Sequence, residues 1–555
     1  LLQFTDRGFD ITQAQARLYG GVVRFEGGMP VSEPGQSSTI RFRGQGTASA
    51  EGLQQADLGF VSRLFQNTSG STGYTAQLGF RGGEPELALT SNLQGLALNL
   101  PAPLNKTAEA IMPLRFESAV VGVVGDLAHA DRLSVSLGPP AAPAVALQYE
   151  RDLRGAEPRV QRGSVAIGLR EGEAAPLPAQ GVLANISLDQ IDVDQWKRAF
   201  ASATSVASRP AAATSDASLA SLADDTSLGY LPATVAVRAN RITTDGRSFN
   251  NVVVGGSRVG ALWRANIDAD ELNGYVEYRP SGVNSAGSIY ARLARLDLPP
   301  SAATDVEQRL QQPGSVPALD IAVDDLVLAN RRLGHVEIEA VNVGAAAQGR
   351  EWRLNRLVMQ VPEARFSATG NWAALAATAV DGAPDAARHT ALNFRLDIDD
   401  SGKLLARFGR EGAVRGGKGR IEGRIGWLGS PLALDYPSLS GQLQADLAGG
   451  QFLQVEPGAA KLLGVLSLQA LPRRLTLDFR DVFSEGFAFD FVRGDARIDK
   501  GVLSTNNLQM KGVNAAVLME GTADIGLEQQ DLKVVVVPEI NAGTAALIAT
   551  AINPA

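Results

Sequence analysis

Few residues in this chain have the types and spacing that chemistry requires. The run Gly255–Gly260 has the glycine content of a phosphate loop but not its spacing, so we expect a turn there. Asp397–Gly402 resembles the start of a calcium loop, but Phe408 stands where the bidentate glutamate belongs. We therefore interpret it as a strand end with a polar turn. Gly70–Gly73 offers hydroxyl groups, with no histidine nearby to activate them.

The residues that most often bind metals or act as nucleophiles are scarce. The chain has no cysteine, which excludes disulfides and thiolate chemistry, and only three histidines, His129, His335 and His389. These histidines are far apart in the sequence, and none has a partner at the spacing of a metal site. We therefore predict no catalytic residue, no metal site and no cofactor, and we expect that the protein is not an enzyme.

Composition narrows the classes further. Of the 555 residues, 45% are hydrophobic and 20% are charged, which is typical of a folded chain. The formal net charge is -8, and no block of lysine and arginine occurs. A nucleic-acid partner is therefore not expected.

The dominant pattern is the alternation of apolar and small or polar residues. Leu96–Leu100 and Phe487–Phe491 show it, and similar segments recur along the chain. Because side chains in a strand alternate between two faces, each segment places its bulky groups on one face. We predict an all-β fold, in which many such strands form an extended sheet with one apolar face.

Composition shifts divide the chain into four segments. Residues 1–200 alternate between strands and glycine or proline turns, and residues 201–232 are rich in Ala, Ser and Thr and read as a loop or linker. The alternation resumes over residues 233–430, with weak repeats, and again over 431–555.

A few segments depart from the strand pattern. We predict short helices over residues 192–200 and 457–468. Val534–Val537 is apolar at every position, which predicts a strand that is covered on both faces.

The weak repeat joins an apolar triplet to a tryptophan. Val252–Val254 precedes Trp263, and Val336–Ile338 precedes Trp352. The spacing differs between the copies, so both a repeated β unit and two unrelated hairpins remain open.

The chain begins at Leu1 without a methionine, and no stretch of it has the roughly eighteen apolar residues of a membrane span. We expect it to be an internal piece of a longer protein.

Two regions are specific enough to suggest relatives. Leu87–Lys106 is one, and Gly450–Phe483, which continues into Gly486–Asp490, is the other. Both resemble the AsmA-like family of bacterial envelope proteins, most closely the C-terminal part of its YhdP members. This family is related to TamB and to bridge-like lipid transfer proteins, and the resemblance extends over the whole chain.

The resemblance implies a long, curved antiparallel β-sheet that is folded into a trough with an apolar lining and carries a few short helices. It implies phospholipid transport between the inner and outer membranes of a Gram-negative envelope. It also implies a periplasmic location and an N-terminal inner-membrane helix that is absent from this chain, with both membrane contacts made by segments outside it.

The bulky members of the alternating segments are the expected lipid-groove residues. They are Leu96, Leu98, Leu100, Leu392, Phe394, Leu396, Ile398, Leu475, Leu477, Phe479, Phe487, Phe489 and Phe491. From the residues alone, they fit an ordinary sandwich core equally well. The alternative function is that of a structural, tethering periplasmic β-sandwich protein without lipid transport.

Overall fold

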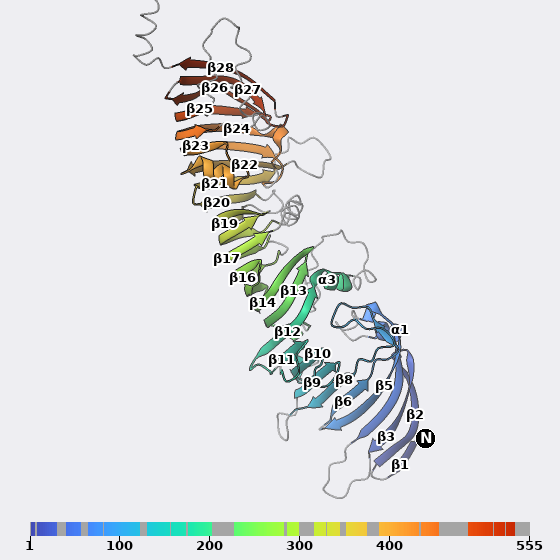
Figure 1. The fold of residues 1–555 in the computed structure, drawn as a ribbon. Helices are drawn as coiled ribbons and strands as arrows, with labels where there is room; N and C mark the ends of the chain where they lie inside the picture. The colour runs from blue at the N-terminus through green and yellow to red at the C-terminus, as the bar shows by residue number, and fades with distance from the viewer. Residues whose placement is uncertain are drawn as a thin grey trace, which may run out of the picture. The chain divides into compact units, whose positions relative to one another are not determined.

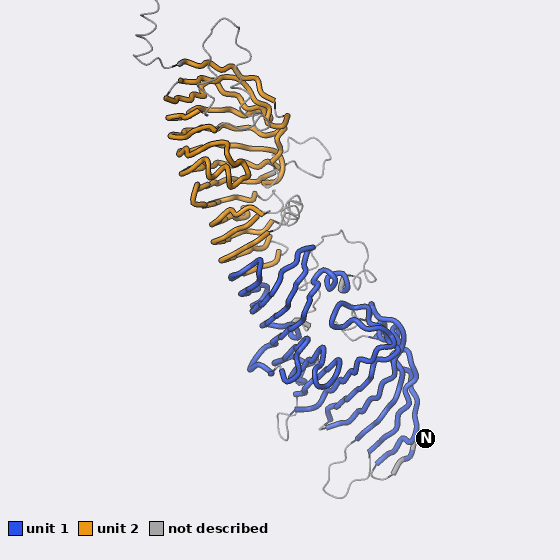
Figure 2. Tube along the Cα trace, in the orientation of Figure 1, with its two compact units in different colours: residues 1–275 blue, residues 276–555 orange. Residues whose placement is uncertain are grey.

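The fold is known from a computed structural model. It describes residues 2–5, 8–29, 40–56, 65–81, 83–121, 130–155, 157–173, 176–201, 227–281, 286–298, 316–328, 330–343, 351–374, 388–431, 434–453, 487–513, 515–527 and 529–538. The chain forms two compact units, residues 1–275 and 276–555 (Figure 2).

The described part of the first unit is a sheet with two helices, α1 and α3, and two short 3-10 segments, η1 and η3 (Figure 1). Its elements are β1 (Leu2–Thr5), β2 (Gly8–Leu18), β3 (Gly21–Met29), β4 (Arg41–Ser49), α1 (Ala50–Gln55), η1 (Phe65–Asn67), β5 (Thr68–Arg81), β6 (Glu84–Ser91), β7 (Leu96–Leu98), β8 (Leu114–Val120), β9 (Ala130–Leu137), β10 (Val145–Asp152), β11 (Arg159–Ile167), β12 (Gly181–Asp192), α3 (Val193–Ala201), η3 (Ser227–Tyr230), β13 (Thr234–Thr244), β14 (Arg247–Val259) and β15 (Leu262–Asp268). The dividing point lies within β16 (Leu272–Arg279).

The second unit is also dominated by strands. Its elements are β17 (Ser288–Leu298), β18 (Ala318–Leu328), β19 (Arg331–Val343), β20 (Glu351–Val361), β21 (Ala364–Ala374), β22 (Arg388–Ile398), α5 (Ser401–Arg407), β23 (Val414–Leu428), η5 (Tyr436–Ser438), β24 (Ser440–Phe452), β25 (Phe487–Asp499), β26 (Val502–Gly512), β27 (Ala515–Asp524) and β28 (Gln529–Pro538).

Neighbours in sequence are neighbours in the sheet. From β1 to β15 each strand pairs with the next, except that β6 pairs with β8 and the short β7 pairs with the start of β5. From β17 to β28 the same order holds. In neither described series do the first and last strands pair with each other, so each sheet is open. The all-β prediction is confirmed.

Most of the described strand pairs are antiparallel, as expected, but β11–β12, β12–β13 and β17–β18 are parallel. A parallel pair needs a connection that returns the chain to the same end of the sheet. Between β12 and β13 this connection contains α3 and η3. Alternation in the sequence indicates on which face of the sheet a residue lies. It does not indicate whether neighbouring strands run parallel or antiparallel.

Tight turns join many antiparallel pairs. Asp245–Gly246 and Lys500–Gly501 have positive φ at both residues, the geometry that matches the twist of a two-residue hairpin. Gly255 lies within β14, and only the end of the predicted Gly255–Gly260 turn is a turn, with φ +60° at Gly260.

The predicted repeat occupies matching positions in the two units. The triplets lie in β14 and β19, and the tryptophans lie in the strands that follow, β15 and β20. In both copies the strand before the triplet, β13 or β18, pairs in parallel with its predecessor. This shared topology favours a repeated β unit.

The predicted helix over residues 192–200 is confirmed as α3, and Asp192 accepts a hydrogen bond from the backbone N–H of Gln195 at 2.8 Å. The helix predicted over 457–468 lies outside the described residues, as does most of the 201–232 segment.

The prediction that Val534–Val537 is covered on both faces is wrong. Val535 and Val537 are 44% and 50% exposed, whereas Val534 and Val536 pack against a buried cluster. A run of valine favours a strand whichever face is covered, so composition could not show which side lies open.

Candidate functional site

Consecutive strands of the second unit share an apolar face. We call it the apolar face of the second unit and define it by three rows of side chains that pair across β18–β25. The outer rows are Leu319, Ala340, Leu354, Gly370, Leu392, Ile425, Gly441 and Ile498, and Val323, Val336, Met359, Phe366, Leu396, Ile421, Ala445 and Gly494. The middle row is Ile321, Ile338, Leu357, Ala368, Phe394, Gly423, Leu443 and Ala496.

None of these twenty-four paired positions, all within the described strands, carries a charged or polar side chain. Many of the bulky ones, including Leu357, Phe394 and Leu443, are only half-buried. Phe366 and Phe394 stack on neighbouring strands, with ring centroids 6.0 Å apart. The face is therefore continuous across eight strands and partly accessible.

The opposite face of the same strands is charged. One row crosses it with alternating sign through Arg365, Asp397, Arg420, Asp446 and Arg493. Arg420 Nε lies 2.9 Å from Asp397 Oδ1, and Arg493 Nε lies 2.8 Å from Asp446 Oδ1. This ladder keeps one side of the sheet hydrated.

The carboxylates of the charged face are stabilised in their ionised form. The Arg395 guanidinium, which donates to Asp397 at 2.8 Å, holds the pKa of that carboxyl below its usual value, with Arg420 adding to the effect. The pKa of Glu337 is lowered by hydrogen bonding to His335 and by the charge of Arg356. These groups remain charged at neutral pH.

A matching row runs across the first unit. It joins one residue from each of thirteen strands from β2 to β15 through directly paired positions. Its members, all apolar or glycine, are Ala14, Phe25, Gly44, Ala76, Leu89, Phe116, Val135, Leu147, Val165, Ala184, Val235, Gly256 and Ala265.

One buried ion pair interrupts the apolar side of the first unit. Asp131 is 3% exposed, and its carboxylate accepts hydrogen bonds from Arg151 and from the hydroxyl of Ser118. Arg151 also donates to the hydroxyl of Tyr230 at 3.3 Å. The ring of Tyr230 packs edge-on against Tyr149, and burial raises the pKa of Tyr149 to about 12. The cluster anchors η3 to β10.

The first predicted groove set lies in a closed local core. Leu96, Leu98 and Leu100 are 1%, 7% and 4% exposed, and the first two pack with Ala50 of α1 and with Leu93. The burial of these residues fits the ordinary-core alternative that the sequence left open.

A buried lysine secures this core. Lys106 Nζ donates to the carbonyl oxygens of Leu93 at 2.8 Å, Leu96 at 2.6 Å and Thr107 at 2.9 Å. Sequence reasoning missed Lys106 and the Asp131–Arg151 pair. The sequence did contain a signal for Asp131. It stands two residues before Leu133, so alternation places this charged residue on the apolar side of its strand.

The second predicted set lies on the apolar face of the second unit. Leu392, Phe394 and Leu396 are half-buried there, and Ile398 is 5% exposed at the end of β22. Leu475, Leu477 and Phe479 lie outside the described residues.

The third set is divided between the faces of β25. Phe487 and Phe489, 5% and 4% exposed, belong to a core cluster with Met510 and Val517. The register then shifts between Phe489 and Phe491.

Because of this bulge, Phe491 pairs with the exposed Ala448 and Lys511, and Arg493 lies over its ring at 4.8 Å. Phe491 is therefore on the charged face. A one-residue bulge exchanges the two faces of a strand, and alternation alone could not locate it.

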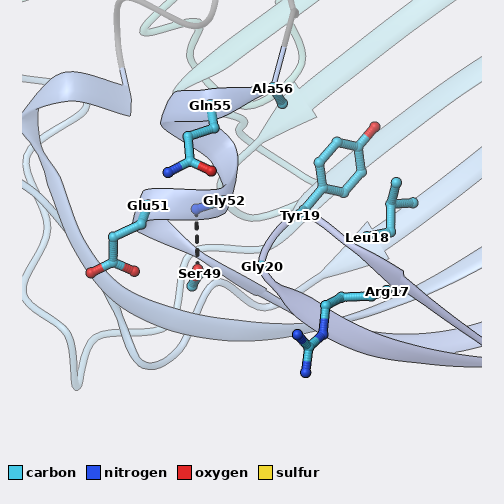
Figure 3. Close-up of a pocket in the computed structure, with 9 residues that line it drawn as sticks. All are labelled: Arg17, Leu18, Tyr19, Gly20, Ser49, Glu51, Gly52, Gln55 and Ala56. Carbon is cyan, nitrogen blue, oxygen red and sulfur yellow. Dashed lines mark hydrogen bonds between the residues drawn. The ribbon is translucent and has the colours of Figure 1, made fainter.

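Two hollows that described residues line are largely polar. The hollow in Figure 3 lies where the β2–β3 turn meets α1 and is lined by backbone, Arg17, Glu51 and Gln55, with Ser49 accepting a hydrogen bond from Gly52 N–H at 3.1 Å. Within the described ranges no cluster of His, Asp and Glu could hold a metal ion. Asp400, from the calcium-like run, caps α5.

Comparison with known proteins identifies a relative. The chain is 26% identical over 314 residues to the Escherichia coli (strain K12) protein named intermembrane phospholipid transporter YhdP. The match covers 56% of this chain and 22% of the relative, so the matched region is about a fifth of that protein. No solved structure matches. Helices long and apolar enough to cross a membrane are not found in the described part of the chain.

A model of the YhdP family matches residues 1–555, the entire length. The resemblance that Leu87–Lys106 and Gly450–Asp490 suggested is thereby confirmed, and this chain belongs to the YhdP family.

Proposed function

We propose that the apolar faces of this chain carry the acyl chains of phospholipids during transport between the inner and outer membranes of a Gram-negative envelope. The observation that carries the proposal is the uncharged, half-buried surface across β18–β25. The name of the E. coli relative supports it.

The energetics fit this role. Exposing an acyl chain to water costs about 0.8 kcal/mol per CH₂ group, or on the order of 10 kcal/mol for sixteen carbons. An apolar face offsets most of that cost, whereas an unpaired charge on it would cost several kcal/mol. The charged ladder keeps the other side of the sheet hydrated and places no charged side chain where the acyl chains would lie.

The proposal includes a periplasmic location, an inner-membrane anchor N-terminal to this chain, and membrane contacts made by segments outside it. The family resemblance supports these parts. Transport in this scheme is passive along the sheet and needs no catalytic group.

Photocrosslinking from neighbouring positions tests the proposal. A benzoylphenylalanine at Phe394, on the apolar face, should crosslink to phospholipid in cells, and one at Asn393, on the charged face, should not. Equal crosslinking at both positions, or none at Phe394, would refute lipid carriage and leave the tethering function.

A further inference from the structure

One rim of the apolar face carries a row of three tryptophans and one threonine. Trp352, Trp372, Thr390 and Trp427 pair across β20–β23 directly beside the apolar rows. Tryptophan combines an apolar ring with one N–H donor and favours boundaries between hydrocarbon and polar groups. The row therefore marks the edge at which the apolar surface ends.

Most polar atoms of this row are bonded within the fold. The indole N–H of Trp352 donates to Pro317 O at 3.2 Å, and that of Trp427 donates to Ser430 O at 2.9 Å. The Thr390 hydroxyl donates to Gly429 O at 2.8 Å. Trp372 differs, because it is 3% exposed and its Nε1 has no hydrogen-bond partner.

A cation lies over this unpaired tryptophan. The guanidinium carbon of Arg388 is 4.5 Å from the centroid of the Trp372 ring. Arg388 shares the face of Thr390, Leu392 and Phe394 because alternate residues of β22 lie on one side. Among the paired positions of that face in the described strands β19–β25, it is the one charged residue.

Arg388 also has no counter-ion in the described part of the chain, unlike the arginines of the charged ladder. Partial burial lowers the pKa of its guanidinium, and none of the described carboxylates offsets the cost. A partly buried cation without an anion is costly, which makes an external anion a favourable partner.

We propose that Arg388 and Trp372 form a subsite for the phosphodiester of a phospholipid whose acyl chains lie on the apolar face. The inference rests on the proposed function and adds the place of the headgroup. Along β22 the lining changes from a cation at Arg388 to apolar side chains at Leu392 and Phe394. Four residue steps separate Arg388 from Leu392, about 13 Å along the strand, so a headgroup and acyl chains could contact different parts of β22.

Calorimetry on the full chain with monomeric short-chain lipids tests the subsite. The probes are dihexanoylphosphatidylglycerol, dihexanoylglycerol, which lacks the phosphate, and inorganic phosphate. The wild type should bind the phospholipid at least tenfold more tightly than the diacylglycerol, and inorganic phosphate weakly. Arg388→Gln should remove this preference, and Arg388→Lys, which keeps the charge but not the bidentate geometry, should reduce it partly.

Arg415→Gln is the matched control, because Arg415 is exposed on the neighbouring strand β23, and it should leave the preference unchanged. A preference that survives Arg388→Gln overturns the subsite while diacylglycerol binding still supports the apolar face. If inorganic phosphate binds as tightly as the phospholipid, Arg388 and Trp372 form a site for free anions, and the phospholipid subsite is overturned. A wild type that binds neither lipid refutes the proposed function itself.

Discussion

At the scale of single residues, the bulge in β25 separates two phenylalanines that the sequence makes equivalent. Phe489 is 4% exposed and packs against Phe452 with ring centroids 5.1 Å apart, whereas Phe491 lies on the charged face. We predict that Phe489→Ala lowers the local stability of β24–β26 by about 3–5 kcal/mol, because it leaves a cavity in a packed core.

Phe491→Ala is the control and should cost much less, since the side chain contributes mainly a contact with Arg493. Amide hydrogen exchange of β24–β26 would measure both effects, because it reports local opening in a chain with more than one unit. Equal losses for the two variants would mean that both rings are buried on one face.

At the scale of elements, one lysine fixes the short strand β7. The strand's edge is tied by Leu98 N–H to Lys106 O and by Lys106 N–H to Leu98 O, while the ammonium group donates to three carbonyls. Lys106→Met should lower the protection of β7 amides by about 2–3 kcal/mol, because buried carbonyls lose their donor.

The matched control is Lys418→Met, whose side chain is 74% exposed and forms one surface ion pair. Exchange in β7 should be unchanged in this variant. Unaltered protection in Lys106→Met would show that hydrophobic packing alone holds the strand.

The docking of α5 should depend on pH. Arg407 Nη2 lies 2.9 Å from Glu363 Oε1, both side chains are largely buried, and this hydrogen bonding lowers the pKa of Glu363 from its usual 4.5. Since the folded pKa is below the unfolded one, the stabilisation is fully present above about pH 4.5 and is lost as the pH falls through the lowered value.

Protection factors of the amides in and around α5, measured from pH 6 down to pH 3, should fall in this window. Glu363→Gln should reduce protection at pH 6 and flatten the pH dependence. An unchanged pH profile in that variant would assign the effect to other carboxyls, such as Asp400 at the helix cap.

Elements also show what the sequence could and could not predict. Alternation identified the strands, and Trp196 and Phe200, four residues apart, identified α3. The bulge at Phe491, the parallel pairs and the closed core around Leu96 depend on contacts between distant segments. Periodicity in one strand has no information on these contacts.

At the scale of the whole molecule, both units place uncharged rows of paired residues on one side of the sheet. Directly paired positions form uncharged rows on one side of each sheet, and in the second unit a ladder of ion pairs covers the other side. Surface ion pairs contribute little to stability, with a median of about 0–1 kcal/mol. Their consistent placement is better explained by the need to keep one face hydrated and leave the other free of charge.

The last prediction tests this separation of the two faces by introducing an aspartate on one face or the other of a single strand. Phe366 and Ser367 are neighbours on β21, but only Phe366 belongs to the apolar face. Phe366→Asp should lower the phospholipid that copurifies with the chain several-fold, because a desolvated carboxylate costs several kcal/mol where acyl chains would lie. Ser367→Asp should leave it unchanged. Mass spectrometry of extracted lipid gives the ratio, and circular dichroism verifies that both variants remain folded. Equal lipid content in two folded variants would show that hydrocarbon does not follow this face.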